Sequence, residues 1–311
     1  MAITAAMVKE LREMTGAGMM DCKKALTNTD GDMDAAVEYL RENGLAKAAK
    51  KAGRIAAEGL VAVALSDDAK AAAIVEVNSE TDFVAKNDTF QAYVAEVADQ
   101  ALTTEAADIE AFLAEESKAE AGKTVKEALD GKIAVIGENL NIRRFSKASA
   151  EDGFVASYIH AGGKIGVLVE VATDVVNDEI KEMGKNVAMQ VAAIAPKYTS
   201  RDEVSKDYIE HETEILKVQA KNENPDKPDN IIEKMIIGRL NKELKEVCLL
   251  DQAYVKAEDG KQAVGKYVEQ VAKANNANVT IKGFIRFETG EGIEKKEEDF
   301  AAEVAKQMAG N

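Results

Sequence analysis

The chain contains the stretch Glu58-Gly59-Leu60-Val61-Ala62, and 94 positions later it contains the similar stretch Asp152-Gly153-Phe154-Val155-Ala156. A second pair of stretches has the same offset, since Ile74-Val75-Glu76-Val77 matches Leu168-Val169-Glu170-Val171. Short matches of Ala and Val arise by chance, but two matches at one common offset are unlikely to do so. The sequence therefore indicates an internal duplication, in which each copy begins with a β-hairpin.

The same dipeptide follows each hairpin, in Thr81-Asp82-Phe83-Val84 and in Thr173-Asp174-Val175-Val176. The offset between these segments is 92, so the first copy has two extra residues within 78–80. Each copy then ends in an expected strand, at 141–145 and at 283–287.

An amphipathic helix is expected between the dipeptide and the closing strand of each copy. In the first copy, Asp88 and Gln91 form a capping-box signal for its start. Helical spacing predicts one buried face per helix, formed by Phe90, Val94, Val97 and Ala101 in the first copy and by Ile180, Met183, Val187, Val191 and Ile194 in the second. Antiparallel sheets with helices on one face predict an α+β fold, with core subdomains at 57–148 and 149–289.

Three short helices are expected before the first hairpin, in a partner-binding module and linker at 1–56. The apolar face of the first helix is expected to contain Met7, Val8, Leu11 and Met14. Gly16 and Gly18 end this helix, Asp32 caps the third helix, and Gly44 is expected to end it. Residues 45–57 contain four basic residues and no acidic one, so we expect a helical linker with either a solvated face or a basic contact for an acidic partner.

The second copy carries an insertion that is expected to form an antiparallel helical hairpin at about 200–249. Ser200 with Glu203 gives a capping-box signal, and the Pro-rich segment 224–228 predicts the turn. The predicted seam consists of Val204, Tyr208, His211, Ile215 and Val218 on the first helix and of Ile232, Ile236, Leu240, Leu244 and Val247 on the second. The last segment, 290–311, is expected to form a C-terminal helical module.

The composition favours a protein partner over a nucleic acid. The chain has 311 residues and a formal net charge of -16, whereas coating a polyphosphate requires excess Lys and Arg. Its two cysteines, Cys22 and Cys248, have no zinc-binding spacing and are expected to be free thiols in a reducing cytosol. No signal peptide and no apolar run long enough for a membrane helix is evident. We therefore expect a cytoplasmic protein that binds neither nucleic acid nor membrane directly.

The residues provide little support for an enzyme. Gly122-Lys123-Thr124 resembles the end of a phosphate-binding loop, but Ser117 stands where such a loop requires its first Gly. His211 is expected on the seam of the hairpin, His160 in a hairpin turn, and no carboxylate is singled out as buried. The segment 81–87 is compatible with two interpretations, in which Phe83 either packs in the core as a hydrophobic staple or is an exposed wedge for a partner.

Several of these segments closely resemble the bacterial elongation factor Ts family. The resemblance rests on Val8-Lys9-Glu10-Leu11-Arg12, the run from Thr15 to Leu26, the run from Thr81 to Asn87, Ile136-Gly137-Glu138-Asn139, and Gly283-Phe284-Ile285-Arg286-Phe287. It extends from the first helix to the tail, while 103–130 and 200–260 carry little signature. The resemblance implies that the N-terminal helices form a ubiquitin-associated-like module and that the duplicated segments form the two-part core of the family.

The resemblance also implies a function. The partner would be the GTPase elongation factor Tu, and the activity would be exchange of its guanine nucleotide, with GDP and GTP met only through the partner and with no cofactor, metal or chemical step in this chain. The implied partner-binding residues are Arg12, Met19, Met20, Thr81, Asp82, Phe83, Val84, Ile136, Gly137 and His160. The stretch Thr81–Val84 is implied to dislodge the Mg²⁺ of the partner. The alternative is a non-catalytic scaffold that uses its N-terminal module to bind another protein.

Overall fold

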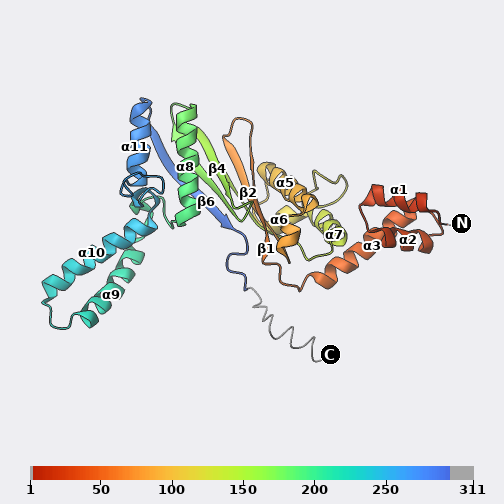
Figure 1. The fold of residues 1–311 in the computed structure, drawn as a ribbon, viewed down its shortest axis with the longest axis horizontal. Helices are drawn as coiled ribbons and strands as arrows, with labels where there is room; N and C mark the ends of the chain where they lie inside the picture. Colours follow the sequence, from red (N-terminus) through yellow and green to blue (C-terminus); the bar gives the residue numbers. More distant parts are fainter. Residues whose placement is uncertain (1–2, 295–311) are drawn as a thin grey trace. The chain divides into compact units, whose positions relative to one another are not determined.

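The computed structural model describes residues 3–294 of the chain, shown as a ribbon in Figure 1. It confirms the α+β fold, with helices and two three-stranded sheets. The described chain divides into two compact units. The first unit comprises residues 3–62, 75–145 and 288–294, and the second comprises Val63–Ile74 and Ser146–Phe287. The four-part division at 56, 148 and 289 stays a prediction, and most of the proposed C-terminal module, 295–311, lies outside the described residues.

The N-terminal module consists of α1 (Ala5–Thr15), α2 (Met19–Asn28) and α3 (Met33–Lys51). The Asp32 side chain accepts a hydrogen bond from the Ala35 N–H and so caps α3, while Gly16 ends α1 with a φ of 66°. A small core holds the three helices together, and its buried members are Val8, Leu11, Cys22, Ala25, Leu26 and Ala36. Met14, which was predicted to share this face, is exposed.

The prediction that Gly44 ends the third helix is wrong, because α3 continues through Gly44 to Lys51. Gly44 lies against α7 (Val125–Ile136), where an added Cβ would come within 3.2 Å of the Ala134 Cβ. The absence of a side chain lets the two helices approach closely. An ion pair of 2.8 Å between Arg41 and Glu127 joins the same two helices. The basic residues predicted for a separate linker are therefore largely the last turns of α3.

The first sheet has the strand order β1 (Glu58–Leu65), β2 (Ala71–Ser79) and β3 (Asn141–Ser149). Between β2 and β3 the chain forms α4 (Asp82–Ala85), α5 (Asp88–Thr103), α6 (Ile109–Ala114) and α7. The predicted face of α5 is buried, but the capping prediction is wrong. The side chain of Asn87, and not that of Asp88, accepts hydrogen bonds from the N–H groups of Thr89 and Phe90.

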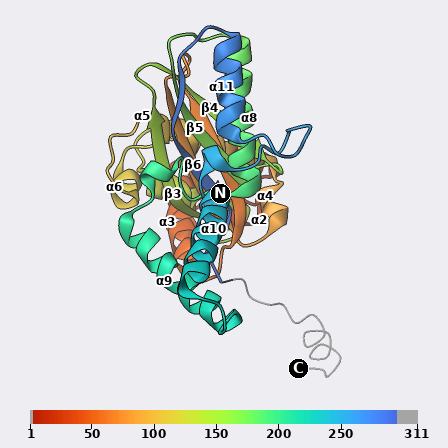
Figure 2. The same ribbon diagram turned by 90° about the vertical axis from the view of Figure 1, so that its left-hand side faces the viewer.

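The second sheet repeats this order with β4 (Gly153–His160), β5 (Ile165–Thr173) and β6 (Val279–Glu288). The strands β4 and β5 are antiparallel, with Gly153 opposite Ala172 and His160 opposite Ile165. The helices α8 (Asp178–Ile194) and α11 (Val264–Ala274) lie side by side, as Figure 2 shows. On α8, Ile180, Met183, Val187 and Val191 are buried as predicted, whereas Ile194 is exposed.

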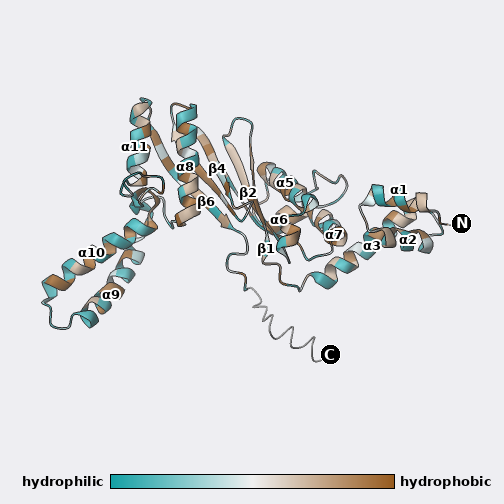
Figure 3. Ribbon diagram, in the orientation of Figure 1, coloured by the Kyte–Doolittle hydropathy of each residue, from teal (hydrophilic) through white to brown (hydrophobic). Residues whose placement is uncertain are grey.

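The helical insertion consists of α9 (Lys206–Glu223) and α10 (Asp229–Val247), which pack against each other and are flanked by the short 3-10 helices Arg201–Glu203 and Leu249–Asp251. The predicted face of α10 is correct, and apolar and polar segments alternate along this helix in Figure 3. The predicted face of α9 is partly wrong, since His211, Ile215 and Val218 are exposed. Leu216 and Ala220 pack against α10 instead, because Ser200 caps the 3-10 helix and α9 begins only after Ser205.

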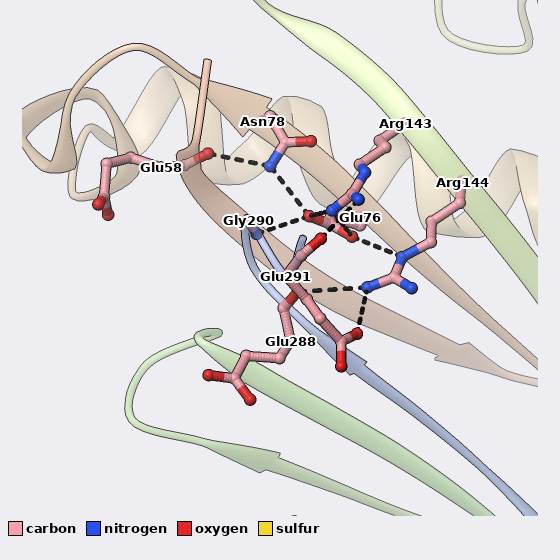
Figure 4. A network of polar contacts seen from close by, with 8 residues as sticks. All are labelled: Glu58, Glu76, Asn78, Arg143, Arg144, Glu288, Gly290 and Glu291. Carbon is pink, nitrogen blue, oxygen red and sulfur yellow. Dashed lines mark hydrogen bonds and ion pairs between the residues drawn. The ribbon is translucent and has the colours of Figure 1, made fainter. Parts of the chain in front are cut away.

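A buried carboxylate in β2 was not foreseen. Glu76 is fully buried, and Figure 4 shows the polar groups that surround it. Its Oε2 accepts a hydrogen bond of 2.6 Å from Arg144 Nε, and its Oε1 accepts one of 3.1 Å from Arg143 Nη1. The Asn78 side chain and the Gly290 N–H also donate to Oε1, at 3.0 and 2.8 Å. The charge is therefore both paired and hydrogen-bonded, as a buried carboxylate requires.

The same network binds the segment that follows β6. Arg143 Nη2 donates to the Glu291 carbonyl oxygen at 2.6 Å, and Arg144 Nη2 donates to the Glu288 carbonyl oxygen at 3.3 Å. Gly290 has a φ of 74°, and a Cβ at this position would lie 2.1 Å from the Ala57 carbonyl oxygen. The returning segment is therefore held against the start of β1 and against the two arginines of β3.

No helix within residues 3–294 is both long and apolar enough to cross a lipid bilayer.

We predict that Glu76→Gln weakens the pH dependence of stability. Burial alone raises the pKa of Glu76, but the hydrogen bonds from Gly290, Asn78 and Arg144 outweigh it and hold the pKa below the ordinary value of 4.5. A depressed folded-state pKa stabilises the fold above the unfolded-state value and loses that effect as the pH falls through the folded-state value. Urea unfolding from pH 7 down to about pH 3 measures this.

Glu76→Gln should cost about 3 kcal/mol at pH 7, because it leaves two arginines without their buried partner. The loss should shrink as the pH falls below 4.5 and through the depressed folded-state pKa of Glu76, because the wild-type carboxylate then takes up a proton. Glu170→Gln, at the matching position of the second copy, is the control. Equal losses of stability for the two variants at every pH would contradict the role of Glu76 as a buried, charge-paired carboxylate.

We also predict that the glycine shared by both hairpins cannot be replaced. Gly59 and Gly153 have φ values of 124° and 110°, and a Cβ would lie 2.2 Å from the Val77 oxygen and 2.1 Å from the Val171 oxygen, respectively. Gly153→Ala should cost more than about 3 kcal/mol in urea unfolding, since steric overlap adds to backbone strain. Gly260→Ala, with a φ of 62° and open space around it, should cost about 1 kcal/mol. A similar loss of stability for Gly153→Ala and Gly260→Ala would show that the positive φ, and not the steric overlap, determines the cost.

Candidate functional site

The segment that begins at Thr81 forms the short helix α4. Thr81 is its N-cap, and the Thr81 Oγ1 accepts a hydrogen bond of 3.4 Å from the Val84 N–H. Ala85 is buried and fixes the inner side of the helix, while Thr81, Asp82 and Val84 are partly exposed. The Asp82 carboxylate forms an ion pair of 2.7 Å with Lys86, one turn further along.

Phe83 points away from the core of the protein. Its side chain is 79% exposed, which excludes the hydrophobic-staple interpretation and leaves the exposed-wedge interpretation. An aromatic ring of this kind supplies a large apolar area for contact with another molecule at a low cost in conformational entropy. Phe90, seven residues later, is fully buried in α5, so the two neighbouring phenylalanines have opposite environments.

Two carboxylates join α4 to the segment after α7. Glu138 accepts hydrogen bonds from the Thr81 N–H at 3.0 Å and from the Thr81 hydroxyl at 2.6 Å. In the other direction, Glu80 accepts a hydrogen bond of 2.6 Å from the Asn139 N–H. We call these two contacts the reciprocal carboxylate clamp. Sequence reasoning missed both glutamates, although Glu138 lies within a segment that carried the family resemblance.

The clamp places two further predicted residues beside α4. Ile136 is the last residue of α7, and Gly137 ends that helix with a φ of 89°. Gly137 is exposed and immediately precedes Glu138, so the chain reaches the clamp directly from the helix end. The structure therefore brings Ile136 and Gly137 next to the segment Thr81–Val84.

Arg12, Met19 and Met20 form a second group, on the N-terminal module. Arg12 lies in the last turn of α1, and the two methionines begin α2 directly after the Gly16–Gly18 bend. All three are exposed. Met14, which is 59% exposed, adds to the apolar surface near this bend. The sequence pattern missed Met14 because its helical spacing matched the buried residues of α1.

His160 lies in the second unit and is the last residue of β4. Its Nδ1 lies 3.0 Å from the Tyr158 hydroxyl, and the two ring centroids are 5.9 Å apart. His160 is exposed, and the N–H groups of Gly163 and Lys164 donate to its carbonyl oxygen in the turn. Tyr158, which was not predicted, therefore orients the His160 ring.

The described residues include the segment that was considered as a phosphate-binding loop. Among residues 3–294, no cluster of three or more His, Cys, Asp or Glu side chains could hold a metal ion. The Gly122-Lys123-Thr124 segment immediately precedes α7, and the Thr124 hydroxyl, at the N-cap, forms a capping box with the Glu127 carboxylate. Lys123 forms an ion pair of 2.7 Å with Glu120. These side chains therefore act in local structure and do not form a phosphate-binding loop.

The described residues define a modular α+β protein with a duplicated sheet unit and an exposed aromatic residue on a short clamped helix. Residues 80–291 match the profile of a family described as Elongation factor TS. The "Elongation factor Ts" of Clostridioides difficile (strain 630) is 58% identical over 306 residues, covering 98% of this chain and 99% of that protein. The proteins of that name from Clostridium botulinum (strain Eklund 17B / Type B) and Clostridium novyi (strain NT) are 54% and 52% identical, with the same coverage. The chain belongs to the elongation factor Ts family.

We predict that Phe83→Ala leaves stability within about 0.5 kcal/mol of the wild type, because an exposed ring contributes little to the folded state. Phe90→Ala, the matched control, should cost about 3–5 kcal/mol, because it leaves a cavity in a packed core. Urea unfolding of both variants measures this. A large loss for Phe83→Ala would show that the ring packs against its own protein in solution.

Proposed function

We propose that this chain is a guanine-nucleotide exchange factor that binds elongation factor Tu loaded with GDP and promotes GDP release during translation elongation. Membership of the elongation factor Ts family supports the proposal, and the observation that carries it is the exposure of Phe83 beside Asp82. In this proposal the chain performs no chemical step, and it meets GDP and GTP only through its partner in the cytoplasm. Its net charge of -16 supports a protein partner and disfavours direct binding to nucleic acid.

An exchange factor acts by linkage. A GTPase holds its nucleotide with backbone N–H groups, a lysine and a Mg²⁺ ion around the phosphates. A protein that binds best to a conformation with those contacts broken weakens GDP binding, and GDP weakens the binding of that protein by the same factor. In the proposed mechanism, Asp82 and Phe83 enter the partner and displace the groups that position its Mg²⁺.

Phe83 cannot do this alone. Full burial of one Phe contributes roughly 1.5–3 kcal/mol, whereas shifting a population from 1:99 to 99:1 requires about 5.5 kcal/mol of differential binding. We therefore assign further contacts to two other surfaces. Arg12, Met19 and Met20 bind the partner through the N-terminal module, and Ile136, Gly137 and His160 add contacts from the two copies of the core.

Release of a fluorescent GDP analogue from elongation factor Tu, followed by stopped flow, tests the proposal. The wild-type chain should accelerate release, and Phe83→Ala should lower the release rate at saturation by about tenfold, since each 1.4 kcal/mol of lost coupling is a factor of ten. Val218→Ala is the control. It removes an exposed apolar side chain from α9 and should accelerate GDP release as much as the wild type does.

Two outcomes would contradict the proposal. If the wild-type chain binds elongation factor Tu but leaves GDP release unchanged, the chain is a scaffold and not an exchange factor. If Phe83→Ala and the wild type give the same release rate at saturation, Phe83 has no part in the mechanism.

A further inference from the structure

The exposed ring of Phe83 presents a physical problem. The helix α4 has four residues, and a single helical turn is not stable by itself in water. The burial of Phe83 cannot hold the turn in place, because the ring is largely exposed. Contacts other than those of the ring itself must therefore hold the turn that carries it.

The clamp supplies such contacts at the start of α4. The N–H groups of the first helical turn have no partner within a helix, and Thr81 precedes that turn. Glu138 binds the N–H and the hydroxyl of Thr81 with its two separate oxygens. Two hydrogen bonds to one charged group are stronger than neutral ones and fix an orientation as well as a distance.

The loop of the second copy that corresponds to Thr81–Val84 has a different set of hydrogen bonds. There, Asp174, which matches Asp82, accepts hydrogen bonds from the N–H and the side chain of Asn278, at 2.8 and 2.7 Å. Both bonds hold the pKa of Asp174 below its ordinary value. Asp174 thus ties its loop to the residue before the closing strand β6, and no helix corresponding to α4 forms, since residues 175–177 have no regular structure.

In the first copy, a different residue joins the loop to the segment before the closing strand. Glu80 lies in the stretch 78–80 that holds the two extra residues, and it binds the N–H of Asn139, which precedes the closing strand β3. Asp82 pairs with Lys86, the residue that follows α4. A carboxylate therefore binds the segment before the closing strand in both copies, Glu80 in the first and Asp174 in the second.

We propose that Glu138 is a positioning residue, which holds α4 through Thr81 so that Phe83 is presented to the partner in a fixed orientation. The consequence for GDP release rests on the proposed function, whereas the effect on α4 itself does not. Glu138 acts through α4, so its removal should matter only while Phe83 is present. Preorganisation of this kind lowers the cost of ordering a contact at binding.

A fluorescent reporter tests the effect on α4 without a partner. The chain contains no Trp, so Phe83→Trp introduces a single indole at the site. We expect Glu138→Ala in this background to lower the fluorescence anisotropy of the indole and to increase its quenching by acrylamide. Glu203→Ala in the same background is the control, because the Glu203 carboxylate accepts a comparable bond of 2.7 Å from the Thr199 N–H in the second unit. Unchanged anisotropy after Glu138→Ala would overturn the proposal.

A double-mutant cycle tests the effect on exchange. Glu138→Ala should lower the GDP release rate at saturation by about tenfold, and the concentration of chain that gives half of the maximal rate should stay within about twofold. Combining it with Phe83→Ala should add no further loss, because both changes remove the same presented ring. Losses that multiply in the double variant would show that Glu138 acts independently of α4 and would overturn the proposal.

A conservative variant is the control for misfolding of Glu138→Ala. Glu138→Gln keeps the shape of the side chain and one acceptor oxygen, so it should recover part of the lost release rate and part of the anisotropy. Equal behaviour of the Gln and Ala variants in both assays would contradict a positioning role for the carboxylate. The two assays can also separate the two proposals. If the wild-type chain does not accelerate GDP release from elongation factor Tu, but Glu138→Ala still lowers the anisotropy, the proposed function is wrong and the positioning of α4 by Glu138 stands.

Discussion

The buried charge of Glu76 is the constraint on which the first unit depends. A carboxylate in the middle of an apolar strand is tolerated only when its partners are in place, and here they come from β2, from β3 and from the segment after β6. The position of the returning chain is therefore set by charge pairing and not by apolar packing alone. Gly290 can occupy its place only because it lacks a side chain, since the Ala57 carbonyl oxygen leaves no room for one.

The duplication explains how one fold carries an exposed aromatic helix in only one of its copies. Both copies share the strand order, the crowded glycine at the start of the hairpin and the tie to the closing strand. In the loop after the hairpin they differ in two inserted residues and in Phe83, which stands where the second copy has Val175. The common features form the sheet unit, and the small differences create an exposed helix on it.

The parts of the fold that depend on local pattern were predictable. The duplication, the buried faces of α5 and α10 and the position of the helical hairpin follow from periodicity and turn residues. The errors at Gly44 and on α9 have tertiary causes. Gly44 continues its helix because it contacts Ala134, some ninety residues away, and α9 begins later because a 3-10 helix uses the Ser200 cap.

Only part of the candidate site was predictable, because several of its residues act through tertiary contacts. The family resemblance named Thr81–Val84 and Ile136–Gly137, but helical spacing could not decide whether Phe83 was buried or exposed. The roles of Glu76, Glu80 and Glu138 depend on residues about sixty positions away or more, so no local pattern identifies them. A carboxylate inside an apolar strand, followed later by two adjacent arginines, was the one available signal for Glu76.

The return of the chain at Glu288 has a consequence for synthesis on the ribosome. The first unit contains residues on both sides of the long stretch Ser146–Phe287. Glu76 therefore lacks its bond from Gly290 until translation has passed that point. At roughly 5–20 residues per second, the nascent first sheet waits on the order of ten to thirty seconds for its last partner. During this interval the growing chain has an incomplete carboxylate site, which the segment after β6 then completes.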